Sequence, residues 1–548
     1  MAGGNEVRTL QYAEQDLQGE SGLSSWPWLD KGVLAAIALF GVVVMLALIS
    51  APHFFLPSED AVILYQYSHN LAHHGAITYY AGGPHAEGAT DFAWMVLVAA
   101  AVRLGVDPFV FSSVVNFCAL PLLALALLRL GRIRVTLLWI LVIAGVAGMT
   151  PQILAAGLGF AVLPDALLLV LLTLAVQRER TSIAALLGLT VCLFRPDGVL
   201  FAVPLLGSLL LPRACRKQRT LLVLLLFVVP GLAYFAWRAH YFGSILPLPF
   251  LVKSDAHRAM GLFVAHSFWQ SLKYLLFLTA LLLPVFVGRP FDRFTRTLFF
   301  GTVLVPTLFF WTMRLDQNVG DRFFYYLPLS AAMVVALSWS TLPPRRRRIL
   351  LYTGLAAWLV LLLGPLLREV RSFRDYQFQD VQAISQELGH LPMRGSMITT
   401  EAGFLAYGSG WVAYDAWGLN TADFARHPIQ AADVAALKPD LIVIHPNPSD
   451  SCVPVQSQFP VSSNRTWAQV IQSLVSGAQQ AGPYQLWLLS YGSPFYRQRE
   501  HWGYGEGNRE CFLVRESSPL AKGITDALER HHAVAPPKSI AMEQGHSH

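Results

Sequence analysis

The 548-residue chain contains little charge. Asp, Glu, Lys and Arg make up 14% of its residues and hydrophobic types 54%, whereas soluble domains carry about 25% charged residues. The apolar residues form blocks such as VLAAIALFGVVVMLALIS and ILLYTGLAAWLVLLLGPLL, each close to the roughly 20 residues that a spanning helix needs. These features exclude an ordinary soluble protein and predict a polytopic α-helical membrane protein.

Several functional signatures are also missing. The sequence has no Walker or Rossmann glycine pattern and no internal repeat, so nothing in it indicates a nucleotide-driven pump. Its formal charge of +6 needs no nucleic acid as a partner, because the basic residues cluster in short loops, as in cytoplasmic loops of membrane proteins. The polar stretch before the first apolar block is richer in acids than in bases, so we expect that block to remain as an anchor.

Five basic loops set the expected topology. They alternate with loops poor in Lys and Arg, and cover residues 129–134, 178–180, 213–219, 289–296 and 345–348. Placing all five in the cytoplasm satisfies the positive-inside bias and gives about eleven membrane spans. We therefore expect a cytoplasmic tail over 1–32, a transmembrane domain over 33–368, and an extracytoplasmic remainder.

A large first outer loop is expected over residues 53–108. Its apolar segment 92–106 is too short to span comfortably and is predicted to dip into the outer leaflet. Residues 61–74 predict an amphipathic helix, with Ser58 as N-cap. The polar residues of this helix are expected on its surface: Gln66, His69, Asn70, His73 and His74. We expect its three histidines to be surface residues rather than metal ligands.

Residues 369–518 have the composition of a soluble domain. SMITTEAGFLAYG, VAYDAWG and DLIVIHP are typical of strands, and DVAALK and TWAQVIQSLVSGAQQ of helices, which predicts an extracytoplasmic α/β domain. Residues 519–548 are expected to be a disordered tail. Only Cys452 and Cys511 lie on the oxidising side, so we predict a disulfide between them; the alternative is two thiols too far apart to bridge.

The predicted spans are almost free of charged residues. Unusual polar residues instead collect at the outer ends of helices, from six loops: Glu59, Asp60, Glu87, Asp91, Asp165, Arg195, Asp197, Lys253, Arg258, Arg314, Asp316, Asp321 and Arg322. A transporter would place such groups near the midplane of the membrane. This distribution favours an enzyme whose substrate is itself embedded in the membrane.

Transfer of a sugar from a lipid-linked phosphate needs a carboxylate to take the acceptor proton and cations to stabilise the leaving phosphate. Asp60, followed by Glu59, is the candidate base. The candidate phosphate-binding cations are Lys253, Arg322, Arg258 and Arg195. Three structural alternatives to these roles remain open. The acids would only stabilise the start of a helix, and the basic side chains would only extend to the lipid headgroups. RPDG around Arg195 would be only a turn.

The segment SEDAVILYQYSHNLAHHGAITYYAGGPHAEGATDFAW resembles the first outer loop of polyprenyl-phosphate-dependent membrane glycosyltransferases of the GT-C superfamily. An acidic pair followed by Ala opens that loop in the family, and Glu-Gly-x-Thr closes it, here at Glu87, Gly88 and Thr90. FRPDG, YFGSILPLPFLVKS, GDRFFYYLPL and TTEAGFLAYGSGWVAYDAWGLNT resemble later family segments in the same order. The nearest subgroup is the terminal arabinofuranosyltransferases (arabinofuranosyltransferase B-like), and the resemblance covers most of residues 33–450.

The resemblance implies an inverting transferase of the bacterial inner membrane. It would move arabinofuranose from a polyprenyl-phosphate donor to an extracytoplasmic glycan, lipid or protein acceptor. Glu59 in place of Asp, with Ser244 and Leu248 where an acid and Asn are common, puts the sugar and acceptor in doubt more than the reaction. Candidates for substrate contact are Glu87, Asp91, Tyr241, Asp321 and Asp415.

No metal ligands are assigned, and a divalent cation stays open as the only cofactor. The rival functions are transfer of another sugar, such as mannose or aminoarabinose, and a lipid-linked glycan flippase or permease. In the outer domain, Trp411, Tyr414 and Trp417 are expected to pack the core rather than stack on a sugar.

Overall fold

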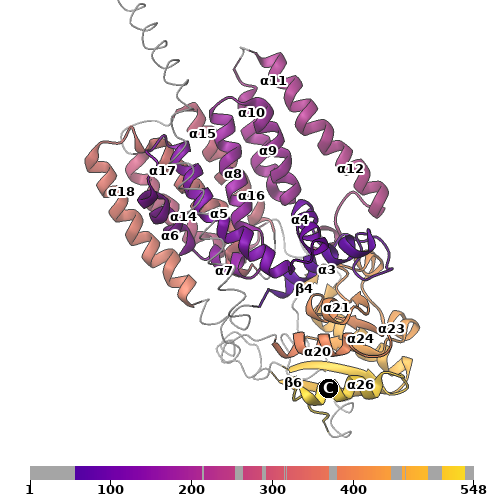
Figure 1. Ribbon diagram of the computed structural model, residues 1–548. Helices are drawn as coiled ribbons and strands as arrows, with labels where there is room; N and C mark the ends of the chain where they lie inside the picture. The colour runs from indigo at the N-terminus through magenta and orange to yellow at the C-terminus, as the bar shows by residue number, and fades with distance from the viewer. Residues whose placement is uncertain are drawn as a thin grey trace, which may run out of the picture.

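The computed structural model describes residues 56–212, 215–253, 263–286, 292–313, 315, 318–368, 379–445, 460–462, 465–490 and 509–536. A bundle of helices forms one end of the molecule and an α/β domain forms the other (Figure 1). Helices α3 (Glu59–His74) and α4 (Phe92–Arg103) of the first outer loop lie between them.

The bundle is built from helices that follow one another along the chain. They are α5 (Pro108–Leu130), α6 (Leu137–Gly148), α7 (Gln152–Gly157), α8 (Val162–Gln177), α9 (Thr181–Phe194), α10 (Val199–Leu209), α11 (Arg216–Val223), α12 (Val229–Phe242), α14 (Ala265–Phe286), α15 (Arg293–Phe299), α16 (Val305–Trp311), α17 (Tyr326–Trp339) and α18 (Pro344–Ala357). Short stretches of tighter or wider helix adjoin them: η2 (Pro196–Gly198), η3 (Leu224–Val228), η4 (Phe300–Leu304), η5 (Val319–Phe324) and η6 (Trp358–Leu363).

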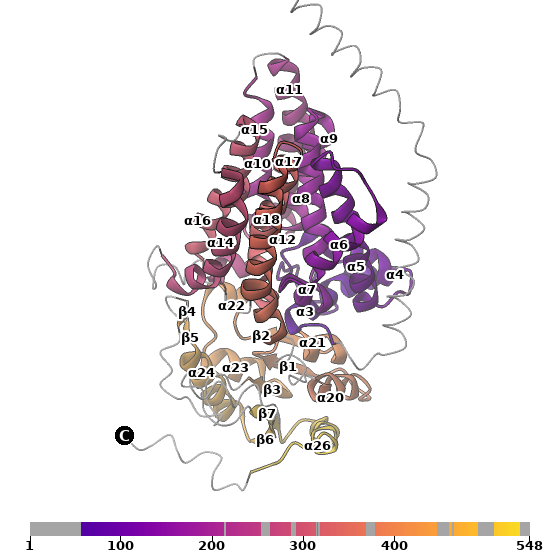
Figure 2. The same ribbon diagram turned by 90° about the vertical axis from the view of Figure 1, so that its left-hand side faces the viewer.

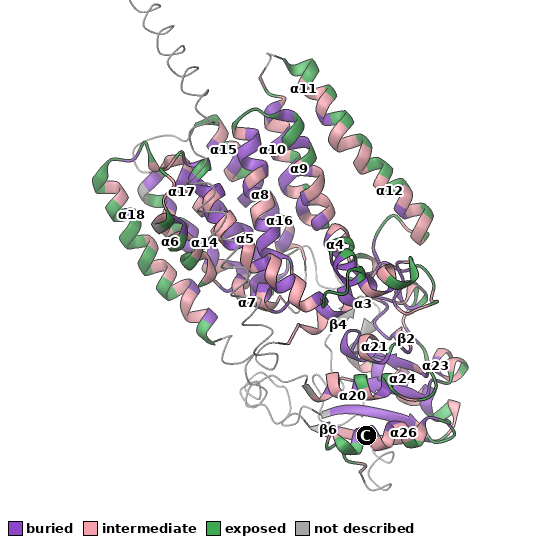
Figure 3. Ribbon diagram, in the orientation of Figure 1, coloured by how far each residue is buried: buried purple, intermediate pink, exposed green. Residues whose placement is uncertain are grey.

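Within the part of the chain that the structure describes, four helices are long and apolar enough to cross a membrane: Pro108–Leu130, Arg216–Phe242, Arg293–Trp311 and Pro344–Arg368. Large apolar side chains on their outer faces are exposed, including Leu232 on α12 and Tyr352 on α18, and these two helices lie on opposite sides of the bundle (Figure 3). Exposed apolar faces of this extent suit contact with lipid. The membrane class is confirmed, while the count of eleven spans stays a prediction.

The basic loops meet at one end of the bundle. Arg132, Glu179, Arg219 and Arg293, from four of the five predicted basic loops, line a single cavity. The helices that carry them lie at the end away from the α/β domain (Figures 1 and 2). The predicted grouping of these loops is therefore found, and their location in the cytoplasm stays a prediction.

The helix predicted over 61–74 is found as α3, but two of its expected surface residues are buried. Gln66 and Asn70 are 3% and 1% exposed and donate hydrogen bonds of 2.8 Å to the carbonyl oxygens of Tyr79 and Thr78. The loop after α3 folds back over the helix, and its buried carbonyls need donors. Ser58 occupies the N-cap position without a capping hydrogen bond from its side chain.

Helix α4 is short, as predicted. It spans 12 residues, with Trp94 and Val98 buried on one side and Val96 and Leu97 exposed on the other. This one-sided burial suits a helix lying at a membrane surface. Its depth in the outer leaflet stays a prediction.

The α/β domain contains a five-stranded sheet in the order β2-β1-β3-β7-β6. Its strands are β1 (Ser396–Thr399), β2 (Val412–Asp415), β3 (Leu441–Ile444), β6 (Tyr484–Ser490) and β7 (Arg509–Arg515). Strand β1 runs parallel to β2 and β3, and β7 runs antiparallel to β3 and β6. The other elements are α20 (Gln379–Gly389), α21 (Phe404–Ser409), α22 (Ala422–Arg426), α23 (Ala431–Leu437), α24 (Trp467–Ala481), α26 (Ala521–Arg530) and the hairpin β4 (Pro460–Ser462) with β5 (Arg465–Thr466).

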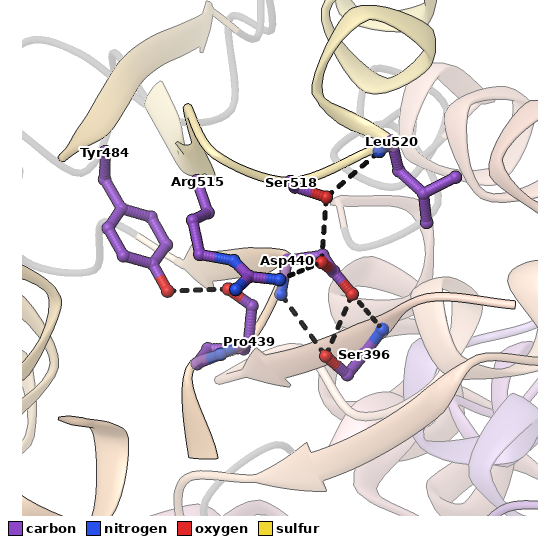
Figure 4. Close-up of polar contacts among 7 residues, drawn as sticks. All are labelled: Ser396, Pro439, Asp440, Tyr484, Arg515, Ser518 and Leu520. Atoms are coloured by element: carbon purple, nitrogen blue, oxygen red, sulfur yellow. Dashed lines mark hydrogen bonds and ion pairs between the residues drawn. The ribbon is translucent and has the colours of Figure 1, made fainter. Parts of the chain in front are cut away.

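A buried carboxylate joins the strands at one end of this sheet (Figure 4). Asp440 accepts hydrogen bonds from the backbone and hydroxyl of Ser396 at 2.9 and 3.0 Å, from Ser518 at 2.8 Å, and from Arg515. Burial opposes ionisation, but these donors, Arg515 first, hold the pKa of Asp440 below its usual range. Asp440 thereby ties β1 to the chain that follows β7.

Two predictions for this domain were wrong. FLAYG forms the helix α21 rather than a strand. Residues 519–536 are folded rather than disordered: α26 buries Ile524, Ala527 and Leu528, and its last residue, Arg530, pairs with Glu387 of α20. Residues 537–548 lie outside the described residues. The amphipathic spacing of these apolar residues gives α26 a face to bury, which the polar composition of the tail concealed.

The first outer loop and the α/β domain share one hydrophobic core. Buried Tyr65 and Trp94 belong to the same cluster as Phe404, Leu405 and Trp411. The burial of Trp411 confirms that it packs the core of the domain. Because of this shared core, the loop and the domain hold each other in place.

Candidate active site between the helical bundle and the outer domain

The predicted base and one predicted cation form an ion pair. Asp60 lies in the first turn of α3, and Arg322 Nη2 donates a hydrogen bond of 2.8 Å to Asp60 Oδ2. The side chain of Asp60 is 27% exposed and that of Arg322 10%. The guanidinium lies 4.0 Å from the centre of the Phe160 ring. Its Nη1 is buried and has no hydrogen-bond partner among the described residues, which leaves a donor for a ligand.

The backbone of η5 determines where Arg322 lies. Gly320 and Asp321 both have left-handed backbone angles, with φ of 59° and 49°. A Cβ on Gly320 would lie 2.7 Å from the carbonyl oxygen of Pro151, so this turn needs a glycine. The turn packs closely against the chain before α7 and directs Arg322 toward α3.

Asp321, predicted to contact substrate, is instead engaged within the protein. It accepts a hydrogen bond of 2.8 Å from the hydroxyl of Tyr274 and pairs with Lys273. Gln152 donates to the hydroxyl of Tyr274 at 2.9 Å. Asp321 therefore anchors the turn that carries Arg322. The sequence analysis missed Lys273, although a lysine in an apolar stretch is itself a signal of function.

Glu59, the second candidate base, contacts the outer domain. Its carboxylate accepts hydrogen bonds from the backbone of Gly403 at 2.5 Å and of Phe404 at 3.0 Å, at the start of α21. Glu401 lies beside it and contacts His445 Nδ1 at 2.8 Å. Burial, and then the charge of Glu401, raise the pKa of Glu59. The two acids of the opening motif thus differ in role: Glu59 binds the outer domain, and Asp60 keeps the exposed carboxylate.

A second charged cluster lies around Arg195, beside the first. Arg195 donates two hydrogen bonds, of 3.0 and 3.1 Å, to the carboxylate of Asp197 and lies 3.4 Å from Asp165. Its guanidinium and that of Arg322 both contact the ring of Phe323, at 5.2 and 5.0 Å. The RPDG segment is therefore a turn, η2, whose ion pair lies next to the candidate site.

Asp91 belongs to the same neighbourhood. It occupies the N-cap position of α4. Burial raises its pKa, while the positive charge of Arg195 opposes that shift. The predicted substrate contact of Asp91 stays a prediction.

The Glu-Gly-x-Thr motif ties the first outer loop to α12. Glu87 pairs with Arg238, which donates hydrogen bonds of 3.0 and 2.6 Å to one carboxylate oxygen, and both side chains are 5% exposed. Burial raises the pKa of Glu87 to about 7, although Arg238 opposes the shift. On the same helix, the hydroxyl of Tyr241 accepts a hydrogen bond from the backbone of Ile77, and its ring stacks on His85. The predicted substrate contacts of Glu87 and Tyr241 stay predictions.

Asp415, also predicted to contact substrate, is fully buried. Its oxygens accept hydrogen bonds from the backbone of Trp417 and from the backbone and amide of Asn420. Asn420 accepts in turn from the hydroxyl of Tyr67, which also accepts from the backbone of Gly88. Asp415 therefore shapes a turn and is not placed to touch a glycan.

The remaining candidates are not brought to the Asp60–Arg322 pair. Lys253 is exposed and makes no recorded contact with either residue among those that the structure describes. Arg258, Arg314 and Asp316 lie outside the described residues, as does Cys452. Cys511 is disulfide-bonded, and its pairing with Cys452 stays a prediction.

Three comparisons with known proteins bear on this site. Residues 368–495 match a family described as a domain of unknown function (DUF8728). The sequence matches no curated protein. The fold is similar to the crystal structure of ArnT from Cupriavidus metallidurans bound to undecaprenyl phosphate, with a TM-score of 0.51 and 12% identity, over 89% of this chain and 98% of that one. At this identity the likeness shows the fold alone.

Proposed function

We propose that this protein is a membrane glycosyltransferase of the GT-C type, which takes a sugar from a polyprenyl-phosphate donor. The observation that carries the proposal is the pair of Asp60 and Arg322, in which one guanidinium nitrogen of Arg322 has no partner within the described part of the chain. The similar structure of ArnT holds undecaprenyl phosphate, which supports a donor of this class. We place the protein in the bacterial inner membrane, with its site on the extracytoplasmic side.

The proposed reaction uses one carboxylate and one cation. Asp60 takes the proton of an acceptor hydroxyl as that oxygen attacks the anomeric carbon. The bond between the anomeric carbon and the phosphate oxygen breaks, and its electron pair leaves with the polyprenyl phosphate. Arg322 stabilises this negative charge through its remaining donor, and its bond to Asp60 orients the base. In-line attack inverts the configuration of the sugar.

Arabinofuranose is our proposed sugar, and it depends on the resemblance of the motifs alone. Mannose and aminoarabinose are the alternatives, and the acceptor is a glycan, lipid or protein. The described residues contain no cluster of three or more His, Cys, Asp or Glu arranged to hold a metal ion. A divalent cation is left as an untested cofactor, and the proposed steps do not use one.

The test is to incubate the purified protein with a panel of polyprenylphosphoryl sugars and to detect released polyprenyl phosphate. We expect release from one donor, and we expect Asp60→Asn to lower the rate by about 100-fold or more while the donor still binds. Asp107→Asn is the matched control, because Asp107 also begins a helix and caps it, and asparagine caps equally well.

Two results would overturn the proposal. Release from none of the donors would favour the flippase or permease. Wild-type turnover in both Asp60→Asn and Glu59→Gln would show that neither acid of the opening motif is the base.

A further inference from the structure

The polar cavity that the basic loops line lies at the opposite end of the bundle from the outer domain. Its volume is about 440 Å³, and the ends of α5, α8, α10 and α17 line it together with the starts of α11 and α15. Cavities of this size hold small molecules or parts of larger ones. Nothing in the proposed transfer reaction uses this cavity, since Asp60 and Arg322 lie beside the outer domain.

Two of the arginines that line the cavity are available to a ligand. Arg219 pairs with Glu179, so these two charges offset each other. Asp292 accepts a hydrogen bond of 2.7 Å from the backbone of Thr295 and keeps its negative charge. Arg132 and Arg293 are exposed, and neither guanidinium makes a recorded ion pair or hydrogen bond among the described residues. Among the described lining residues, Arg132 and Arg293 outnumber the carboxylate of Asp292, so the unpaired charge is positive in sum.

The walls of the cavity are partly apolar. Leu211, Phe294 and Leu337 line it and keep part of their side chains exposed. A ligand that fits must carry both a negatively charged group and an apolar part. A soluble anion such as inorganic phosphate would meet the arginines but would leave these apolar side chains without a contact.

We propose that this cavity binds the headgroup and glycerol of an anionic phospholipid. The phosphate lies between Arg132 and Arg293, and the start of the acyl chains lies against the apolar side chains. The helix ends of a membrane bundle lie at the level of the headgroups, and basic pockets between such helices bind anionic lipids. The site is separate from the proposed active site and does not depend on the proposed function.

The experiment measures retention of phosphatidylglycerol by the full-length protein, using native mass spectrometry and a titration with labelled lipid in detergent. We expect the wild type to bind phosphatidylglycerol about tenfold more tightly than phosphatidylcholine. The double variant Arg132→Gln/Arg293→Gln is expected to lose this preference. Arg345→Gln/Arg348→Gln is the matched control, because it removes two exposed arginines that do not line the cavity.

Each outcome decides the proposal. Loss of the preference in the cavity variant and its retention in the control support it. Equal loss in both variants would show a general effect of charge and would overturn it. Competition by inorganic phosphate at the same concentration as the lipid would identify a site for a free anion. Absence of preference in the wild type would also overturn it. A thermal unfolding curve of each variant excludes misfolding as the cause of a loss.

Discussion

The guanidinium group of Arg322 has three different environments. Nη2 donates to Asp60, the planar face lies against Phe160, and Nη1 has no partner among the described residues. A buried donor left unpaired costs about 1–3 kcal/mol. A phosphate oxygen placed at Nη1 would remove that cost, so this nitrogen favours a bound phosphate ligand.

A lysine at this position cannot do the same. Arg322→Lys keeps the charge, but a single ammonium group lacks the planar fork that reaches Asp60 and a phosphate together. We expect the rate of transfer to fall by about 10–100-fold, with a rise in the KM for the donor. Steady-state kinetics over a range of donor concentrations measures both. Arg394→Lys, in the outer domain, should leave both unchanged; equal kinetics in the two variants would contradict the role of Arg322.

The carboxyl groups of Glu59 and Glu401 predict a dependence of stability on pH. Burial raises the pKa of Glu401; a hydrogen bond with Glu59 opposes this shift, and the charge of Asp60 adds to it. His445 Nδ1 contacts Glu401 at 2.8 Å, and this contact is an ion pair only when the imidazole is protonated. A carboxyl with a raised pKa binds a proton on folding. Its contribution to stability is therefore complete below about pH 4.5, the ordinary value for glutamate, and is lost as the pH rises through the folded pKa.

We therefore expect the free energy of unfolding to fall by on the order of 1–3 kcal/mol between pH 5 and pH 8. Glu401→Gln should flatten this fall, because the amide stays neutral throughout. Thermal unfolding at pH 5, 6.5 and 8 measures it. Glu387→Gln is the control, since the pKa of Glu387 is lowered by Arg530 and this variant should keep the wild-type slope. An unchanged slope in Glu401→Gln would show that other groups, such as His445, cause the dependence.

At the scale of elements, the turn η5 is the part on which the site depends most. Gly320 has a φ of 59°, and a Cβ there would lie 2.7 Å from Pro151 O and 2.8 Å from Ala155 N. Gly320→Ala must therefore shift the turn and with it Arg322. We expect the rate of transfer to fall about tenfold or more, beyond the ~1–2 kcal/mol that the left-handed backbone alone costs an alanine.

Gly105→Ala separates the two effects. Gly105 has a φ of 79°, but its Cβ would meet nothing within 4 Å. This variant should lose stability through the backbone alone and keep the wild-type activity. If Gly320→Ala and Gly105→Ala lose equal stability and both keep full activity, the packing of η5 does not position Arg322.

The elements that the sequence predicted are those with a strong local pattern. Helices α3, α23 and α24 show the apolar period of a helix, and β1 to β3 are short apolar runs between turn residues. Strands β6 and β7 were missed because polar residues such as Gln485, Glu510 and Arg515 interrupt or bound their short apolar runs, which weakens the local pattern of a strand. Helix α26 was missed because its few apolar residues lie within a polar tail.

The site was predicted in part for a different reason. Asp60 and Arg322 are 262 residues apart in the chain, yet a membrane confines the outer ends of helices to one plane. Polar residues at those ends are thereby limited to a few neighbours. The roles of Asp321 and Asp415 could not be predicted in this way, because the sequence alone does not show whether an aspartate side chain is buried or exposed. Only the partners, such as Tyr274 and Asn420, distinguish them.

At the scale of the whole molecule, the outer domain completes the first outer loop. Phe404 and Trp411 share a buried core with Tyr65 and Trp94, and the backbone at Gly403 binds Glu59, next to Asp60. A Cβ on Gly88 would lie 1.8 Å from Asn420 Oδ1, so the loop and the domain are in direct contact at a second point. The domain is therefore part of the same folded unit as the first outer loop rather than an appended binding module.

This arrangement predicts the effect of truncation. A chain that ends at Arg368 loses the domain and exposes the apolar side of α3 and α4, including Tyr65 and Trp94. Large exposed apolar patches cause association. We expect this chain to aggregate or to be degraded when expressed, and to show no transfer. Size-exclusion chromatography in detergent, followed by the donor assay, measures both.

A milder truncation tests whether the lost contacts are the cause. Removing only residues 537–548 leaves α26 and the shared core intact, so that chain should remain monodisperse and active. Loss of activity there would point to a role for the last residues rather than for the core. If the chain ending at Arg368 were monodisperse and transferred sugar at the wild-type rate, the outer domain would not hold α3, and Glu59 would have no structural part in placing Asp60.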